Sequence, residues 1–203
     1  IDLGAGLKAR VPLALAGDDL IGLHMGSMQS LQVIGVLGYV LQSSPDVRTQ
    51  LAHTARYFAL QQEGAAITLR NAGPVAEFVY TVFDPDVSLH RQDAEGTLAL
   101  AVANWRTLTG QPHWSPLSVH FEHPAPAGQQ ELGRFFGCPV HFSDSFDGMR
   151  FPPAFLDMPI QSADPGLHAI LTRYAEDSLA GHRDMTSLAM RTRRLIAASL
   201  ANG

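Results

Sequence analysis

Two arginines and three aromatic residues are the side chains of this sequence best suited to hold a small organic molecule: Arg56, Tyr57, Tyr80, Trp105 and Arg106. A guanidinium pairs with a carboxylate through parallel hydrogen bonds, and an aromatic ring covers apolar surface. Ligand pockets combine a few such groups with a mostly apolar lining. We therefore expect a binding site in which either arginine pairs with a ligand carboxylate and the rings cover the remainder. The alternative is that the aromatic residues are ordinary core and both arginines are solvated.

The sequence makes no comparable case for catalysis. Ser143 and Ser145 lack the glycine-flanked turn that exposes a hydrolase serine. Cys138 lies between glycine and proline, with no basic neighbour to lower its pKa, which favours a structural thiol. The carboxylates are scattered and form no acid–base pair on an apolar helix face. We predict a chain without catalytic residues that is not an enzyme, and an enzyme with an unrecognised site is the alternative.

Nine histidines raise the question of a metal site. His120, His123 and His141 are close in the expected sheet, but strand alternation directs His120 and His123 to opposite faces. No pair of histidines or cysteines has the spacing of a structural zinc site. The sequence therefore predicts neither a metal nor any other cofactor.

Composition restricts the class of protein. Of the 203 residues, 46% are hydrophobic, which suits one compact domain with a substantial core. The net charge of -5 argues against direct nucleic-acid binding, which requires clustered lysine and arginine. A single cysteine excludes an internal disulfide and favours a reducing compartment. The apolar runs are too short to span a bilayer and the first residues do not resemble a signal peptide, so we expect a cytoplasmic chain without membrane contact.

Hydrophobic periodicity predicts several helices. Apolar residues recur at helical spacing over 31–41, and Gly38 within this segment would allow a close backbone approach. A second helix starts after Ser44-Pro45-Asp46, with Ser44 as N-cap and the proline in the first turn. Its buried face is expected to carry Val47, Leu51, Ala55 and Phe58. A third helix covers 92–108 and includes Trp105, and a fourth covers 129–136.

The spacing changes to that of strands between these helices. Runs 66–70 and 75–83 are separated by a turn and predict a hairpin. The second run is apolar on both faces, so helices should shield the sheet on both sides. A strand is expected at 117–121, and short strands at 139–142 and 149–151 flank a turn at Asp147-Gly148. The predicted fold is α+β, a mixed or antiparallel sheet with helices packed on it, in a single domain. The ligand cavity would lie between the helices after Asp46 and at 92–108 and the sheet.

The C-terminal part predicts two further helices. Asp164-Pro165 caps the first, whose apolar side carries Leu167, Ile170, Leu171, Tyr174 and Leu179. The second covers 186–200 and is polar on most of its circumference. The apolar side either forms a symmetric dimer interface or packs onto the same chain.

Collinear motifs in this sequence resemble those of a family of regulatory domains. In the first half they are GDD at 17–19, GLHMG at 22–26, GVLGY at 35–39 and SSP at 43–45. In the second half they are VHFEHPAP at 119–126, FFGCPVHF at 135–142 and LDMPI at 156–160. The chain resembles, over about 7–180, the N-terminal effector-binding and dimerisation domain, labelled arabinose-binding, of AraC/XylS-type transcription regulators.

This resemblance implies a function and a division of the chain. Residues 1–182 would form the effector-binding regulatory domain, and 183–203 a C-terminal helix that links it to a helix-turn-helix domain absent from this sequence. The implied partners are a small-molecule effector and a second copy of the chain, with DNA contacted only through that absent domain. The alternative is a pure dimerisation module with no ligand.

Overall fold

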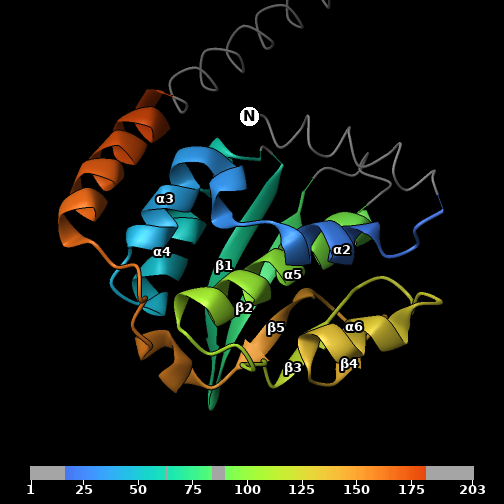
Figure 1. Cartoon of the computed structure of the whole chain (residues 1–203). Helices are drawn as coiled ribbons and strands as arrows, with labels where there is room; N and C mark the ends of the chain where they lie inside the picture. The colour runs from blue at the N-terminus through green and yellow to red at the C-terminus, as the bar shows by residue number, and fades with distance from the viewer. Residues whose placement is uncertain (1–16, 63, 84–89, 182–203) are drawn as a thin grey trace, which may run out of the picture.

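The computed structural model describes residues 17–62, 64–83 and 90–181. Its centre is a five-stranded mixed sheet in the order β1-β2-β5-β3-β4 (Figure 1). Strands β3 (Ser118–His120) and β4 (Val140–His141) are parallel, and every other neighbouring pair is antiparallel. The expected α+β fold with helices packed on a mixed sheet is confirmed. The first residues, the helix predicted at 186–200 and the boundary at 182–183 lie outside the described residues.

The predicted hairpin is confirmed and is longer than expected. Strand β1 (Ala65–Ala72) pairs with β2 (Val75–Val82) from Ala65↔Val82 to Ala72↔Val75. The two-residue connection includes Gly73 at φ 69°, in the left-handed region that glycine adopts without steric penalty. This tight turn determines the register and so places the aromatic residues of β2 on the core face.

The turn predicted at Asp147-Gly148 is wrong. Both residues lie inside β5 (Asp147–Phe151), and β5 pairs with β2 and β3 rather than with β4. The partner of Gly148 in β2 is Val79, and a Cβ at Gly148 would lie 2.3 Å from a backbone oxygen of Phe78. Glycine is therefore present because of a close backbone approach in the sheet, a contact that local turn statistics do not detect.

The described helices cover one face of the sheet instead of two. The covered face presents Ile67, Phe78 and Met149, which are all buried. The opposite face carries the ion pair between Arg150 and Glu77, 2.9 Å apart, and the exposed Thr68. Most side chains on this second face are polar, although Val79 is buried there, so the apolar appearance of the 75–83 run misled the prediction.

Trp105 is the centre of the core between the helices and the sheet. It comes from α5 (His90–Leu108), the longest described helix. Its ring contacts the edges of Phe78, Phe151 and Phe155 at centroid separations of 5.5–5.8 Å. Edge-to-face pairs of this kind are the preferred aromatic geometry, so α5 has a defined position over β2 and β5.

Helix α4 (Val47–Tyr57) begins where expected but with a different cap. Asp46, not Ser44, accepts the hydrogen bond from the backbone N–H of Thr49, at 2.7 Å. The reason is tertiary, since Asp46 is extended and forms a bridge with Pro159. Ala55, expected on the buried face, is exposed, and Thr54 takes its place.

The helix predicted over 31–41 is broken in two. A 3-10 turn (Leu31–Ile34) precedes α3 (Gly35–Ser43), and Gly35 has φ 61° at the junction. The close approach expected at Gly38 is present, because a Cβ there would lie 1.9 Å from the carbonyl oxygen of Leu31. The break folds the 31–34 turn back against α3, which no helical period predicts.

The helix predicted after Asp164 covers 165–181 and is drawn in orange in Figure 1. Asp164 caps it as expected, accepting from the backbone N–H of Leu167 at 3.0 Å. Ala175 and Leu179 are buried against the rest of the chain, whereas Ile170 and Tyr174 are 68% and 59% exposed. Part of the predicted apolar side thus packs internally and part faces solvent.

Helix α2 (Ile21–Met28) packs on α5 through backbone contact. A Cβ at Gly22 would lie 2.1 Å from the carbonyl oxygen of Gln92, and one at Gly26 would lie 2.2 Å from that of Gly96. Contacts this short are possible only without side chains at both glycines. The α2–α5 pair therefore depends on these two positions.

A group of charges around the buried Glu95 joins the first turns of α5 to the segment before α2 and to the loop after β3. Glu95 is fully buried and accepts from Arg91 at 3.0 Å, while Arg91 also pairs with Asp19 at 2.9 Å. The Nε2 atom of His123 lies 3.4 Å from the same Glu95 carboxylate. Burial raises the pKa of Glu95 to about 7, although Arg91 opposes the shift.

We expect Gly26→Ala to lower the free energy of unfolding by about 1–3 kcal/mol, because the new methyl group forces α2 away from α5. Chemical denaturation measures the change. Gly133→Ala in α6 (Gln129–Phe136) is the matched control, since a Cβ at Gly133 would meet no atom within 4 Å apart from its neighbours in the same helix. At position 133, alanine should raise the free energy of unfolding by at most roughly 1 kcal/mol, because its helix propensity exceeds that of glycine. Equal effects at both positions would contradict the packing argument.

We expect Glu95→Gln to become more stable relative to the wild type as pH rises. The wild-type carboxyl has a raised pKa in the folded state, so its stabilising contribution is complete below its ordinary value of 4.5 and is lost as pH rises to about 7. Glutamine does not ionise, so the difference in free energy of unfolding should grow by about 3 kcal/mol over this interval. Denaturation at a series of pH values measures it, and a difference independent of pH would contradict the raised pKa.

Candidate functional site

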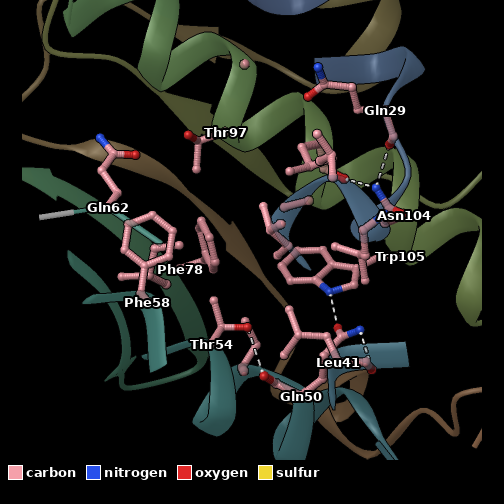
Figure 2. Close-up of a pocket in the computed structure, with 18 of the residues that line it drawn as sticks. Gln29, Leu41, Gln50, Thr54, Phe58, Gln62, Phe78, Thr97, Asn104 and Trp105 are labelled. Carbon is pink, nitrogen blue, oxygen red and sulfur yellow. Dashed lines mark hydrogen bonds between the residues drawn. The ribbon is translucent and has the colours of Figure 1, made fainter. Parts of the chain in front are cut away.

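A cavity of about 80 Å³ lies between α4, α5, the 31–34 turn and the sheet, several times the space needed for one water. Most of its wall is apolar, with Phe58, Phe78 and Trp105 as its aromatic members (Figure 2). Helix α5 contributes one side through Thr97, Ala101 and further residues of the same face. The cavity occupies the position that the sequence predicted for a ligand site.

Two amide side chains form the polar frame of this cavity. The Nε1–H of Trp105 donates to Oε1 of Gln50 at 2.7 Å, and Nε2 of Gln50 donates to the carbonyl oxygen of Leu41 at 3.2 Å. Asn104 accepts from the backbone N–H of Leu31 at 3.2 Å and donates to the carbonyl oxygen of Gln29 at 3.0 Å. These bonds join α5 to α4, to the end of α3 and to the segment before the 31–34 turn (Figure 2).

An ionisable group lies at another part of the wall. Asp93 is buried and accepts a short hydrogen bond from the hydroxyl of Tyr80. The amide of Gln62 donates to the same carboxylate at 3.2 Å and to the Tyr80 hydroxyl at 3.0 Å. The three side chains thus form a closed hydrogen-bonded group that connects β2, α5 and the segment that follows α4.

Of the five residues predicted for the site, two belong to the cavity region. Trp105 lines the cavity directly. Tyr80 adjoins it through Asp93 and Gln62, which line it. Both are also core residues, as the alternative interpretation stated: Trp105 packs and lines the cavity, whereas Tyr80 packs beside it.

The other three residues have their polar groups directed elsewhere. Arg56 forms a two-bond pair with Glu176 of helix 165–181 at 2.5 and 2.7 Å. The hydroxyl of Tyr57 donates to the same carboxylate at 2.5 Å, and burial with this bond raises the pKa of Tyr57 to about 12. Arg106 donates to the carbonyl oxygens of Trp114 and Phe135 at 2.7 and 2.9 Å. These groups join helices and loops to one another.

Sequence reasoning did not single out Gln50, Thr54, Thr97 and Asn104, which line the cavity. Glutamine, threonine and asparagine are common on helix surfaces, so their type alone carries no signal. Helical spacing does contain a signal for two of them, because Gln50 and Thr54 lie on the same face of α4 as the buried Val47 and Leu51. Polar residues on an apolar helix face mark a position where hydrogen-bond partners are required.

One group of described residues has donor atoms close enough to hold a metal ion: His90, Glu122 and Asp147, within 4.8 Å of one another. Nε2 of His90 lies 2.5 Å from a carboxylate oxygen of Asp147, and the backbone N–H of Glu122 donates to the other oxygen at 2.9 Å. These contacts fasten the start of α5 to β5. The histidines considered from the sequence lie elsewhere, with His120 and His141 stacked at 4.8 Å.

Cys138 is half-buried, and burial raises its pKa to about 11, so its thiol is protonated at neutral pH. A protonated thiol is a weak nucleophile, in agreement with the structural role expected from the sequence. Among the described residues, no helix combines the length and the apolar character needed to cross a membrane.

Comparison with known proteins relates these features to a family. The family model of the arabinose-binding domain at the N-terminus of AraC transcription regulators matches residues 10–160. The ornithine utilization regulator of Pseudomonas aeruginosa is 25% identical over 185 residues, covering 91% of this chain and 54% of its own. The HTH-type transcriptional regulator VirS of Mycobacterium tuberculosis is 24% identical over 157 residues, covering 76% of this chain and 46% of its own.

A solved structure has the same fold. The crystal structure of the transcriptional regulator CdpR from Pseudomonas aeruginosa superimposes with a TM-score of 0.60 at 20% identity, covering 72% of this chain and 48% of that one. The chain spans about half the length of the curated relatives it matches. From the family match over most of its length, this chain belongs to the arabinose-binding domain family found at the N-terminus of AraC transcription regulators.

Proposed function

We propose that this domain senses a small organic effector in the cavity between α4, α5 and the sheet, and that it transmits the binding event through a dimer. The observation that carries the proposal is a mostly apolar cavity with a fixed polar frame in a domain of this family. Effector pockets have this combination of apolar lining and a few placed polar groups. The relatives are named as regulators, which favours binding without conversion.

The connection from the cavity to the rest of the molecule runs through α4. One side of this helix lines the cavity with Gln50, Leu51 and Thr54. Its last turn holds helix 165–181 through Arg56 and Tyr57, which share the Glu176 carboxylate. A ligand that displaces α4 therefore also moves helix 165–181. The ligand changes the arrangement only if it binds one arrangement more tightly than the other.

Helix 165–181 supplies the surface for a second copy of the chain. Leu167, Ile170 and Tyr174 are 44%, 68% and 59% exposed, and their spacing of three and four residues places them on one helix face. Ala175 and Leu179, on the other side of the helix, are buried against the rest of the chain. The outer apolar face is therefore left for a partner. In a two-fold dimer the same face of each copy would be covered.

The remaining partners follow from the family. In the whole regulator, DNA would be bound by a separate helix-turn-helix domain, and the net charge of -5 makes this chain itself unsuited to that task. A transcription regulator of this kind acts in the cytoplasm. The sensing domain would then control how two attached readers are spaced on DNA.

We expect Ala101→Phe to weaken effector binding strongly, because the ring occupies the cavity from α5. A thermal-shift screen of metabolites on the wild type identifies a ligand, since one present at a hundred times its Kd adds about 2.7 kcal/mol to the free energy of unfolding. Affinity for that ligand should fall at least about tenfold in Ala101→Phe. Thr107→Phe adds the same ring on the exposed side of α5 and should bind normally. Turnover of the ligand, or equal binding by both variants, would contradict the proposal.

We expect the double change Ile170→Glu and Tyr174→Glu to convert a dimer into a monomer, because it places charge in the apolar contact. Sedimentation velocity at micromolar concentration measures the association state. Leu117→Glu alters another large apolar side chain, 50% exposed in the loop before β3, and should leave the dimer intact. A wild-type chain that sediments as a monomer would overturn the assignment of this face.

A further inference from the structure

We infer that the effector is an uncharged, largely apolar molecule with at most one or two hydrogen-bonding groups. The inference rests on the proposed function and adds the chemical class of the ligand. It follows from which polar groups of the cavity wall are already engaged within the protein, and from the kinds of charge that the wall contains.

The described wall contains Asp93 as its ionisable residue and includes no lysine, arginine or histidine. Arg56 and Arg106, the two cations expected to receive a carboxylate, are held by Glu176 and by backbone carbonyl oxygens away from the cavity. A carboxylate inside this cavity would have no cation to pair with on the described wall. Burying an unpaired carboxylate is among the most unfavourable steps in recognition.

A ligand ammonium group meets a different obstacle. The only carboxylate on the described wall, that of Asp93, is buried and already accepts from Tyr80 and Gln62. Both donors bind the same oxygen, Oδ2, so an ammonium group would join a carboxylate that these two hydrogen bonds already stabilise, and the ion pair would recover only part of the ammonium's lost hydration. A cationic ligand therefore gains little from Asp93 and still loses its own hydration.

The neutral polar groups of the wall are also largely occupied. Both functional groups of the Gln50 amide and of the Asn104 amide are hydrogen-bonded within the protein. The hydroxyl of Thr54 donates to the carbonyl oxygen of Gln50 at 2.9 Å. Within the described part of the chain, the side chains of Thr97 and Gln29 and the Oε1 atom of Gln62 remain to form hydrogen bonds with a ligand. One or two neutral polar groups on the ligand would satisfy them.

Matched trios of small probes test the class without knowledge of the natural ligand. Hexanol, hexanoate and hexylamine share a chain, and benzyl alcohol, benzoate and benzylamine share a ring. We expect the alcohols to stabilise the wild-type protein in thermal shift and calorimetry, with affinities at least about tenfold above those of the acids and amines of the same size. The comparison uses the wild type, so no variant needs to fold for the result to count.

Two variants assign the result to the cavity. Ala101→Phe should remove the response to the alcohols, whereas Thr107→Phe should retain it. Thr97→Lys places a cation on the wall and should shift the preference from the alcohol toward the carboxylate of the same trio. This shift is a gain of binding, which a generally destabilised protein would not show.

The outcomes separate this inference from the proposed function. Acids or amines that bind as well as the alcohols, and lose binding in Ala101→Phe, would overturn the uncharged class and leave the sensing site in place. If no probe stabilises the wild type, and Ala101→Phe gives the same thermal shifts as the wild type, the result would count against the cavity as a sensing site. It would then remove the basis of the proposed function and of this inference.

Discussion

The hydrogen bond between the indole of Trp105 and the amide of Gln50 is the interaction on which the cavity depends. It is buried, 2.7 Å long, and connects α5 directly to α4. Since the other end of the Gln50 amide is bonded to the carbonyl oxygen of Leu41, the three helices have a defined separation. Trp105 both packs in the core and donates this hydrogen bond, so it keeps α4 and α5 in contact at one end of the cavity. Ala101 and Thr97, which have smaller side chains, leave space along the adjacent turns of α5.

The cavity is apolar in character because its polar side chains are already hydrogen-bonded within the protein. Each amide that faces it also fixes a backbone segment, as Asn104 does for the segments at Leu31 and Gln29. Breaking such a bond to reach a ligand would leave a buried donor or acceptor unpaired, which is costly. The frame that makes the cavity rigid therefore also limits the ligand to groups that need few partners.

Arg56 and Tyr57 have a role that differs from ligand pairing. Both bind Glu176 and thereby couple the cavity wall to helix 165–181, whose outer face is apolar and exposed. An arginine on the same helix as the cavity residues thus connects sensing with association, the two activities proposed for this domain.

The sequence by itself determined the class of fold, the hairpin, the course of α5 and the family, because periodicity, turn residues and collinear motifs are local signals. It also located the cavity between α4, α5 and the sheet. Only the tertiary structure decided that Asp147 lies within a strand, that one face of the sheet is polar, and where the two arginines point. Side-chain direction is determined by partners distant in the chain, as Glu176 is for Arg56, 120 residues away. Such partners leave no local pattern, because folding alone brings them together.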